Sequence, residues 1–439
     1  MSLSIAIIGT GPSALYAADG ILKKAPEARI DLIDRLPTPY GLVRFGVAPD
    51  HLGTKNVTRQ FDKTFEKENV RLFGNLTVGH DITIEELKSR YDAVLLATGA
   101  QQDKTLGIEG EDLEGIYGSA AFVGWYNGHP DRFAKNPIAE HTRQAVVIGN
   151  GNVSIDISRL LIKEESELAE SDICAHARKA ILEAGIQNVY LAGRRGPLEA
   201  SFTPPELREL GKLEKAVPVI ENADIPDALP DSIDTSIPSG RVTAKNMEIM
   251  RSFADLEADK AERKIHLLFH ASPVAFLGDR HVTAVRFEKT AIDDEGRAVG
   301  TGEFFEIPAD LVVTAIGYRS RPIEGIPFDE KRGNFPNNDG HIEDNLYVVG
   351  WGKRGPSGTI PTNRADSFQV ANKLLDDLAG QDSEKGGPDA FDSLIRDKGL
   401  SPTSFSDWKT IERAEEQNAT APAPREKFTS IQDMLALLN

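Results

Sequence analysis

The chain has 439 residues, 40% of them hydrophobic and 27% charged, which is ordinary for a globular protein and long enough for two or three domains. Its net charge of -18, from 50 basic and 68 acidic residues, argues against nucleic acid binding, which needs clustered Lys and Arg. The single cysteine, Cys174, excludes an internal disulfide, a cysteine-based zinc site and an iron–sulfur cluster.

The first hundred residues alternate strands with helices. We expect a strand over 5–9, a helix after Pro12, and further strands over 29–34 and 91–99. Strand–helix–strand order predicts a parallel sheet. Since the chain enters a strand by Ser4 and no apolar run approaches a membrane span, we expect no signal peptide and a cytoplasmic protein.

The first strand runs into a glycine-rich turn, Gly9-Thr-Gly11-Pro-Ser-Ala14. Gly9 permits the tight turn, Gly11 lets backbone amides approach a pyrophosphate, and Ala14 lets the helix lie close to the strand. Asp34 ends the next strand, where a carboxylate can accept hydrogen bonds from ribose hydroxyls. An unliganded turn is the alternative, but the whole pattern favours a dinucleotide with a free ribose, consistent with FAD.

A second turn of the same kind follows a strand from Ala145 and comprises Gly149, Asn150, Gly151, Asn152 and the small Ser154. The next strand, over 188–192, is followed by Arg194 and Arg195 instead of an acid. Two guanidinium groups can clamp a 2′-phosphate, which favours NADP over NAD. The arginines lie about forty residues past the turn where about twenty is usual. A helical segment predicted over 161–184, with Ser171 or Asp172 as a cap and Gly185 as the stop, fills the gap. A solvated charge pair is the alternative.

The rest of the chain continues the alternation. Further expected elements are an acidic, proline-rich loop over 221–239, helical periodicity over 241–268, a strand over 311–317, a strand over 346–350, and helices over 366–378 and 431–438. The two similar units predict an α/β fold of two Rossmann-like dinucleotide-binding domains, the NADP domain inserted into the FAD domain. We place the FAD domain at 1–106 and 318–439 and the NADP domain at 107–317.

Two dinucleotide sites in one chain imply hydride transfer between a nicotinamide and a flavin. With one cysteine the chain has neither a disulfide relay nor a built-in cluster. The electrons therefore leave to an external acceptor: a one-electron protein, a quinone, oxygen or a diffusing substrate.

Seven motifs, in collinear order over nearly the whole chain, resemble the adrenodoxin reductase family, which are ferredoxin–NADP reductases of the glutathione-reductase structural type. They are "PYGLVRFGVAPDH" (39–51), "FVGWYN" (122–127), "GNGNVSIDISRLL" (149–161), "GRRGPLEASFTPPELREL" (193–210), "IGYRSRPI" (316–323), "GWGKRGPSGTI" (350–360) and "SFSDW" (404–408). The resemblance implies an NADPH-dependent FAD enzyme that passes single electrons to an iron–sulfur ferredoxin, and a monomer.

The resemblance also assigns cofactor contacts. The FAD contacts are Ser13, Asp34, Leu42, Val78, Trp351, Gly358, Thr359 and Ile360. The NADP contacts are Gly149, Asn150, Gly151, Asn152, Arg194, Arg195, Glu206 and again Gly358. Asp34 stands where the family usually has a glutamate, and Trp351 where related flavoproteins have an aspartate.

The resemblance gives two polar residues, His51 and Asp156, a place near the nicotinamide and the flavin. The histidine could move a proton as the flavin changes redox state. A purely structural histidine that orders its loop is the alternative, because hydride transfer itself needs no side-chain acid or base.

A ferredoxin is normally acidic, so the resemblance implies a basic docking face. Candidates are Lys23, Lys24, Arg208, Lys212, Arg241, Lys245 and Arg251; each could equally be an ordinary solvated charge. Two other functions stay open: a flavin monooxygenase acting on a small substrate, and a non-catalytic electron-input subunit, against which the single cysteine argues.

Overall fold

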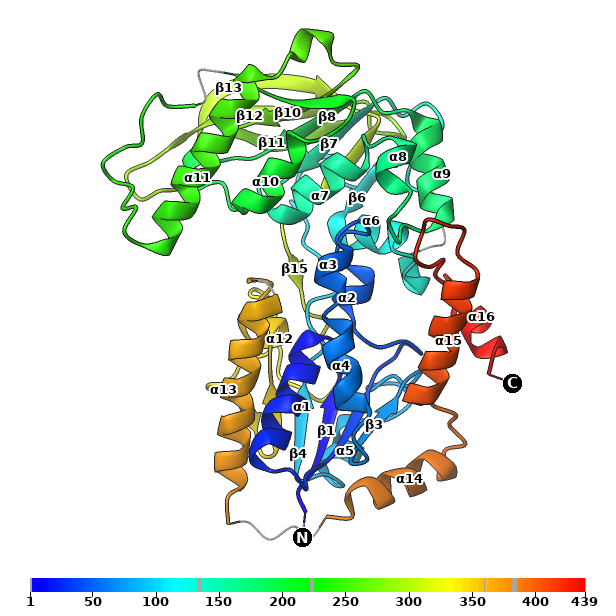
Figure 1. Cartoon of the computed structure of the whole chain (residues 1–439). Helices are drawn as coiled ribbons and strands as arrows, with labels where there is room; N and C mark the ends of the chain where they lie inside the picture. The colour runs from blue at the N-terminus through cyan, green and yellow to red at the C-terminus, as the bar shows by residue number, and fades with distance from the viewer. Residues whose placement is uncertain (1, 133–135, 222–224, 359, 381–384, 439) are drawn as a thin grey trace. The chain divides into compact units, whose positions relative to one another are not determined.

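The structure is a computed structural model and describes residues 2–132, 136–221, 225–358, 360–380 and 385–438. The chain divides into two compact units (Figure 1). Unit 1 comprises Met1–Gln102, Gly317–Thr420 and Pro424–Asn439, and unit 2 comprises Asp103–Ile316 with Ala421–Ala423. The boundaries between the units lie at 102/103 and 316/317 in the structure, whereas the sequence analysis placed them at 106/107 and 317/318.

Unit 1 is built on a six-stranded sheet in the order β16-β17-β4-β1-β2-β3. The strands are β1 (Ser4–Ile8), β2 (Arg29–Ile33), β3 (Val70–Phe73), β4 (Ala93–Leu96), β16 (His341–Glu343) and β17 (Leu346–Val348). All neighbours are parallel except β16, which pairs antiparallel with β17 at the edge. Every residue of β1 is buried, as expected for a strand covered on both faces.

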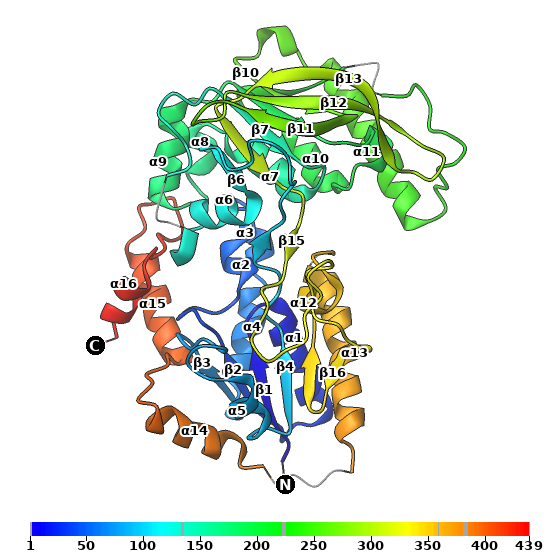
Figure 2. The ribbon, with the colours of Figure 1, turned by 180° about the vertical axis from the view of Figure 1, so that it is seen from behind.

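Helices cover both faces of this sheet (Figures 1 and 2). One face carries α1 (Pro12–Lys24), α4 (Thr58–Phe65), α13 (Ile360–Leu378) and α15 (Phe405–Gln417), whose core includes Leu15, Phe61, Leu374 and Trp408. The other face carries α5 (Ile84–Lys88) and α14 (Gly387–Asp397). The remaining short elements are α2 (Leu42–Phe45), α3 (Leu52–Lys55), α12 (Trp351–Arg354), α16 (Ile431–Ala436), β5 (Gln102–Asp103) and β15 (Tyr318–Arg319).

Unit 2 has a six-stranded parallel sheet in the order β6-β14-β7-β8-β10-β9. Its strands are β6 (Ile116–Gly118), β7 (Gln144–Ile148), β8 (Asn188–Ala192), β9 (Ala216–Ile220), β10 (Arg263–Leu268) and β14 (Leu311–Thr314). A three-stranded antiparallel sheet, β11 (Ala271–Leu277), β12 (Ala284–Ile292) and β13 (Ala298–Pro308), packs on one face around Val146, Phe276 and Phe287 (Figure 2).

The helices of unit 2 lie mainly over the other face of its parallel sheet (Figure 1). They are α6 (Ser119–Tyr126), α7 (Asn152–Leu160), α8 (Glu165–Leu168), α9 (Ala175–Ala184), α10 (Pro204–Leu210) and α11 (Pro238–Ser252), with single 3₁₀ turns at Pro130–Arg132, Pro197–Glu199, Phe253–Asp255 and Ala258–Lys260. Here α7 packs on β7 and β8, α10 packs on α7, and α11 packs on α10.

Two expectations for unit 2 are corrected by the structure, and one sheet is additional to them. The segment expected to be helical over 161–184 holds two separate helices, α8 and α9. Helix α9 begins after Cys174, close to the caps expected at Ser171 or Asp172, and it is followed by the expected stop, Gly185, which is left-handed with φ 61°. The helical pattern over 241–268 ends at Ser252, and its last six residues form β10, in which burial alternates along the strand. The antiparallel sheet β11–β13 is not among the expected elements.

Candidate functional site: two glycine turns

The first glycine turn is held between the ends of two strands of unit 1. Gly9 has φ 107°, and a Cβ there would lie 2.5 Å from the carbonyl oxygen of Ala97, just after β4. Its N–H donates to the carbonyl oxygen of Ile33 at the end of β2 (2.7 Å). A Cβ at Gly11 would meet nothing within 4 Å, and α1 begins there without a side-chain cap. The turn therefore presents free helix amides on an open side, as a pyrophosphate requires.

Asp34, directly after β2, bonds to this turn. One carboxylate oxygen accepts from the backbone N–H and the hydroxyl of Thr10 (3.0 and 2.6 Å), and the other accepts from the N–H of Leu36 (3.1 Å). Burial raises the pKa of Asp34 despite the hydrogen bonds from Thr10. The structure thus brings the predicted ribose reader to the glycine turn and fixes its orientation.

Ser13, in the first turn of α1, lies against a second strand end of unit 1. Gly350 has φ 69°, and a Cβ there would lie 2.2 Å from the Ser13 hydroxyl oxygen. The Ser13 carbonyl accepts from the hydroxyl of Ser367 on α13 (3.0 Å). The adjacent Trp351 stacks on Tyr318, with ring centroids 6.0 Å apart, and its indole N–H donates to the carbonyl of Ser357 (3.1 Å).

The Gly350 turn depends on a residue that the sequence did not indicate, Asp366. Its carboxylate accepts from the N–H of Gly350 (2.7 Å), the ammonium of Lys353 (3.0 Å) and the guanidinium of Arg354 (3.3 Å). No local motif marks it, because it lies on α13 and reaches back to the end of β17 through the fold.

The other predicted FAD contacts lie at varied positions in unit 1. Leu42 begins α2 and is 41% exposed, next to Gly41, where a Cβ would lie 3.2 Å from the Cα of Gly11. Val78 lies after β3 and forms an isolated β-bridge with Ile82. Gly358 has φ 83° and Ile360 begins α13; Thr359 lies outside the described residues.

The second glycine turn repeats the first in unit 2. Gly149 has φ 139°, and a Cβ there would lie 2.3 Å from the carbonyl oxygen of Ala315, just after β14. Its N–H donates to the carbonyl of Ala192 at the end of β8 (2.8 Å). Helix α7 begins after Gly151 with no side-chain cap, and Ser154 is fully buried. This turn also offers uncapped helix amides to a ligand.

The two asparagines of this turn have different environments. Asn152 accepts from the N–H of Thr203 (2.8 Å) and donates to its hydroxyl (3.3 Å). Asn150 lies against Gly193, and neither polar atom of its buried amide has a hydrogen-bond partner among the described residues. A buried amide without a partner is costly, so a bound nucleotide that satisfied it would fit this turn.

Arg194 and Arg195 follow β8 and are both exposed. Their backbone is fixed to the antiparallel sheet: the carbonyl of Arg194 accepts from the hydroxyl of Thr290 (2.6 Å), and that of Arg195 accepts from the N–H of His270 (3.1 Å). Neither guanidinium forms an ion pair with a described residue. Two unpaired charges on a fixed backbone suit recognition of a phosphate group.

Asp156 lies on α7 beyond the second turn and pairs with Arg159 (2.7 Å). The guanidinium of Arg159 is 1% exposed and also pairs with Glu209 of α10 (3.0 Å). Glu206 lies in the first turn of α10. His51 belongs to unit 1, where its carbonyl accepts from the N–H of Thr54 at the start of α3 (3.0 Å). Since His51 and Asp156 lie in different units, their meeting stays a prediction.

Comparisons with known proteins agree with this two-turn architecture. A family model described as pyridine nucleotide-disulphide oxidoreductase matches residues 3–184. The mitochondrial NADPH:adrenodoxin oxidoreductase of Arabidopsis thaliana is 38% identical over 460 residues, covering 99% of this chain and 95% of the relative. The NADPH-ferredoxin reductase FprA of Mycobacterium leprae is 40% identical over 450 residues, covering 99% and 98%.

A solved structure gives the same result. Mycobacterium tuberculosis FprA in complex with NADPH matches with a TM-score of 0.94 and 39% identity, covering 100% of this chain and 99% of that chain. The chain belongs to the adrenodoxin reductase family. Membership of the adrenodoxin reductase family confirms the predicted fold class, a flavoprotein reductase with two nucleotide-binding α/β units. Among the described residues, no helix has the length and apolar character to cross a membrane.

Proposed function

We propose that this chain takes a hydride from NADPH and passes electrons singly to a ferredoxin-type iron–sulfur protein. It is an NADPH-dependent ferredoxin reductase with FAD and NADP(H) as cofactors. FAD, when bound, supplies the conversion of a two-electron donor into one-electron steps. The observation that carries the assignment is the contrast at the strand ends, a carboxylate at the first glycine turn and two unpaired guanidiniums at the second.

Unit 1 would hold the FAD. The open side of Gly11 and the uncapped start of α1 would receive its pyrophosphate, and Asp34 would accept from its ribose. Ser13 and the Gly350–Trp351 turn, which meet in the structure, would orient the remainder of the group. Leu42, Val78, Gly358, Thr359 and Ile360 remain proposed contacts.

Unit 2 would hold NADPH. The amides after Gly151 would bind the pyrophosphate, the amide of Asn150 would gain a partner, and Arg194 and Arg195 would bind the 2′-phosphate. Asn152 would support the NADPH site indirectly, since its side-chain oxygen accepts a hydrogen bond from the backbone N–H of Thr203. Glu206 remains a proposed contact.

The decisive experiment compares the two nicotinamides. The purified protein should show a flavin spectrum and should be reduced far faster by NADPH than by NADH. Changing Arg194 and Arg195 together to Ala should raise the Michaelis constant for NADPH roughly 100-fold, since two charge-assisted hydrogen bonds are lost, and leave that for NADH unchanged. Arg280→Ala, which removes an exposed arginine elsewhere in unit 2, is the matched control. Equal use of both nicotinamides by the unaltered protein would refute the assignment.

His51 and Asp156 are proposed to act at the redox centre rather than in phosphate binding. The pairing with buried Arg159 fixes the Asp156 carboxylate. Asp156→Asn should therefore leave the dissociation constant of NADPH largely intact and slow flavin reduction in stopped-flow measurements. A defect confined to NADPH affinity would contradict this role.

The iron–sulfur partner would dock on a basic hollow in unit 2. Its lining has three basic residues and one acidic residue, Arg208, Lys212, Lys245 and Glu248, together with the apolar Ile249, Phe253 and Leu256. Lys245 also pairs with Glu248 (2.7 Å). Arg241 and Arg251, on the same helix as Lys245, donate to the carbonyls of Ser236 and Pro226. On unit 1, Lys24 remains a candidate, and Lys23 pairs with Asp19 (2.8 Å).

Electrostatic docking predicts a rate of ferredoxin reduction that falls as salt rises. Arg208→Glu combined with Lys212→Glu should lower this rate about tenfold at low salt and flatten its salt dependence. Lys179→Glu, on α9, makes a charge reversal of the same kind at another surface and should have little effect. A flat salt profile for the unaltered protein would contradict the basic hollow. The cytoplasmic location and the monomeric state stay predictions.

A further inference from the structure

The segment before α2 contains two successive left-handed residues, Tyr40 with φ 80° and Gly41 with φ 50°. Left-handed backbone is strained at a tyrosine, so other contacts must hold it. The segment presses on the first glycine turn. The N–H of Tyr40 donates to the carbonyl of Thr10 (3.1 Å), and a Cβ at Gly41 would lie 3.2 Å from the Cα of Gly11. The strained residues therefore border the proposed pyrophosphate site.

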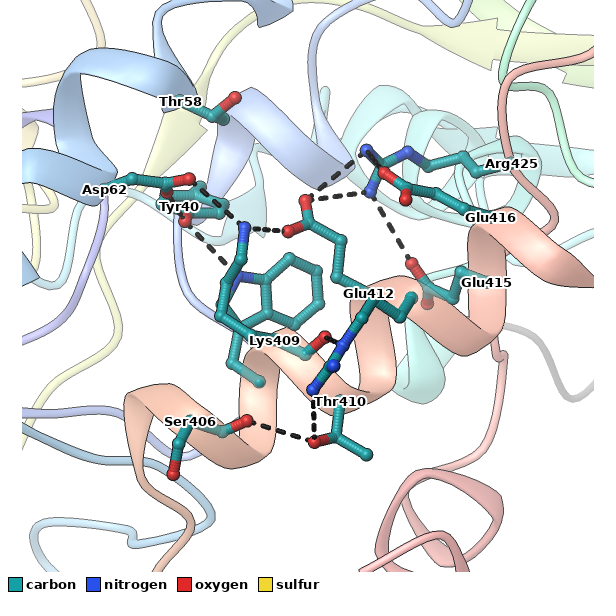
Figure 3. Close-up of polar contacts among 12 residues, drawn as sticks. Tyr40, Thr58, Asp62, Ser406, Lys409, Thr410, Glu412, Glu415, Glu416 and Arg425 are labelled. Carbon is teal, nitrogen blue, oxygen red and sulfur yellow. Dashed lines mark hydrogen bonds and ion pairs between the residues drawn. The ribbon is translucent and has the colours of Figure 1, made fainter.

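The tyrosine side chain is held from the C-terminal part of the chain (Figure 3). Its hydroxyl donates to the carboxylate of Asp62 on α4 and accepts from the indole N–H of Trp408 on α15 (3.2 Å). The rings of Tyr40 and Trp408 meet edge to face, with centroids 5.8 Å apart, and both residues are at most 2% exposed. Lys409 of α15 pairs with Asp62 (3.2 Å) and with Glu412. Helix α15 thus braces the first left-handed residue.

The same helix also holds the far end of the segment. Arg44 of α2 forms a bidentate ion pair with Glu415 of α15, and the two side chains are 4% and 0% exposed. Glu415 also accepts from the N–H of Phe428 (3.0 Å), and the guanidinium carbon of Arg44 lies 5.0 Å from the ring centroid of Trp408. A buried ion pair adds little net stability over an apolar contact, but it fixes register, since a misplaced partner leaves a buried charge unpaired.

We propose that α15 clamps the segment Tyr40–Arg44 against the first glycine turn, with Tyr40, Trp408 and Glu415 as positioning residues for the FAD pyrophosphate. The proposal rests on the proposed function, because it takes FAD as the ligand of that turn. Trp408 and Asp62 hold the strained end, and Glu415 holds the other end through Arg44. Loss of either hold lets Tyr40 and Gly41 relax, which moves the wall beside Gly11 and releases the cofactor faster.

The test measures FAD release from the holoenzyme by recovery of flavin fluorescence after dilution. Tyr40→Phe, Trp408→Phe and Glu415→Gln should each release FAD about tenfold faster, with the dissociation constant of NADPH unchanged. Glu416→Gln is the matched control, because this neighbour on α15 is 52% exposed and shares Arg425 with Glu415 (3.6 and 3.8 Å) but does not pair with Arg44. Tyr40→Phe removes only one hydroxyl and decides the question if Glu415→Gln does not fold.

A second readout separates positioning from general stability. The thermal midpoint of the flavin-free protein should fall little in Tyr40→Phe. The double variant with Trp408→Phe should release FAD no faster than the more affected single variant, since both substitutions break the hydrogen bond between Trp408 and Tyr40. FAD release at the unaltered rate in all three variants would overturn the clamp. A protein that binds no FAD at all would instead overturn the proposed function.

Discussion

The two glycine turns share a backbone device and differ in the side chains around it. In each, the first glycine is left-handed, its missing Cβ leaves room for a carbonyl from a neighbouring strand end, and its N–H bonds to the end of the following strand. The carbonyls belong to Ala97 in unit 1 and to Ala315 in unit 2, and a Cβ would approach them to 2.5 and 2.3 Å. Neither contact involves a side chain that could tell one dinucleotide from another.

The difference appears one step further along, after the second strand of each unit. Asp34 accepts hydrogen bonds from Thr10 in the glycine turn. Arg194 and Arg195 instead bond to described residues through their backbone carbonyls, and both residues are exposed. From this comparison we infer that the backbone of each turn receives a pyrophosphate, while the side chain at the strand end determines which dinucleotide is bound.

The largest effect is expected when the first glycine of one turn is substituted, because both turns depend on the missing Cβ of that glycine. Gly149→Ala places a Cβ against the Ala315 carbonyl and strains φ, a cost of roughly 3 kcal/mol. We expect the dissociation constant of NADPH to rise about 100-fold with FAD content unchanged, measured by titration and by flavin absorbance. Gly9→Ala makes the equivalent change in the turn of unit 1 and should lower the FAD content of the purified protein with the dissociation constant of NADPH unchanged. Loss of both ligands from either variant would show that the turns are not independent.

Next in size is the loss of the strand-end carboxylate. Asp34→Ala removes two hydrogen bonds to Thr10 as well as the proposed ribose contact, so FAD should dissociate about tenfold more readily. Asp34→Glu keeps a carboxylate at this position and should recover most of the affinity. The measurement is equilibrium FAD binding to the flavin-free protein, and unchanged affinity in Asp34→Ala would deny this residue its role.

A smaller effect separates the two asparagines of the second turn. Asn150→Ala deletes an amide without a hydrogen-bond partner among the described residues. The free energy of unfolding should therefore stay unchanged, while the dissociation constant of NADPH should rise about fivefold. Asn152→Ala deletes two hydrogen bonds to Thr203 and should lower the free energy of unfolding by about 1–2 kcal/mol. Chemical denaturation and NADPH titration of both variants check the contrast, which fails if Asn150→Ala is the less stable.

The smallest expected effect is a pH dependence in unit 2. Burial, and then the charge of Lys264, lowers the pKa of His266, which stacks on Tyr190 with ring centroids 4.5 Å apart. The unfolded chain therefore takes up the proton more readily, so the stability from this group is complete above about pH 6.5 and is lost as pH falls toward the folded pKa.

His266→Gln should reduce that acid sensitivity by about 0.5 kcal/mol or less, because the ring is only partly buried and solvent screens it. Urea denaturation at a series of pH values measures it. The control is His281→Gln, whose side chain is 65% exposed. An identical acid sensitivity in the unaltered protein and His266→Gln would remove His266 as its source.

The sequence predicted the parts of the fold that are encoded locally. The glycine turns, their strands and the residues at the strand ends lie within short segments whose spacing follows from one strand–turn–helix unit. No proline or glycine lies within 161–184, so the non-helical stretch between α8 and α9 was indicated only by the possible caps Ser171 and Asp172. The apolar residues of β10 continue the helical spacing of the segment before them, so the sequence pattern alone predicts one helix across both elements.

The contacts that the sequence could not indicate join distant segments. Asp366 supports the Gly350 turn from a separate helix, and Glu415 reaches Arg44 across 371 positions in the sequence. Such pairs follow no local periodicity, since only the packing of helices on the sheet brings them together. The motifs "PYGLVRFGVAPDH" and "SFSDW" were recognised separately, but their meeting at Tyr40 and Trp408 needs the fold.

The way in which the arginine loop is tied down has a consequence for how this protein could change its cofactor. Thr290 and His270 hold only the main chain of Arg194 and Arg195. The backbone position therefore does not depend on the two arginine side chains, so a substitution at either residue need not disturb the antiparallel sheet. We therefore expect that substitutions at these two positions alter nicotinamide preference without a redesign of the loop, which makes them a simple starting point for engineering.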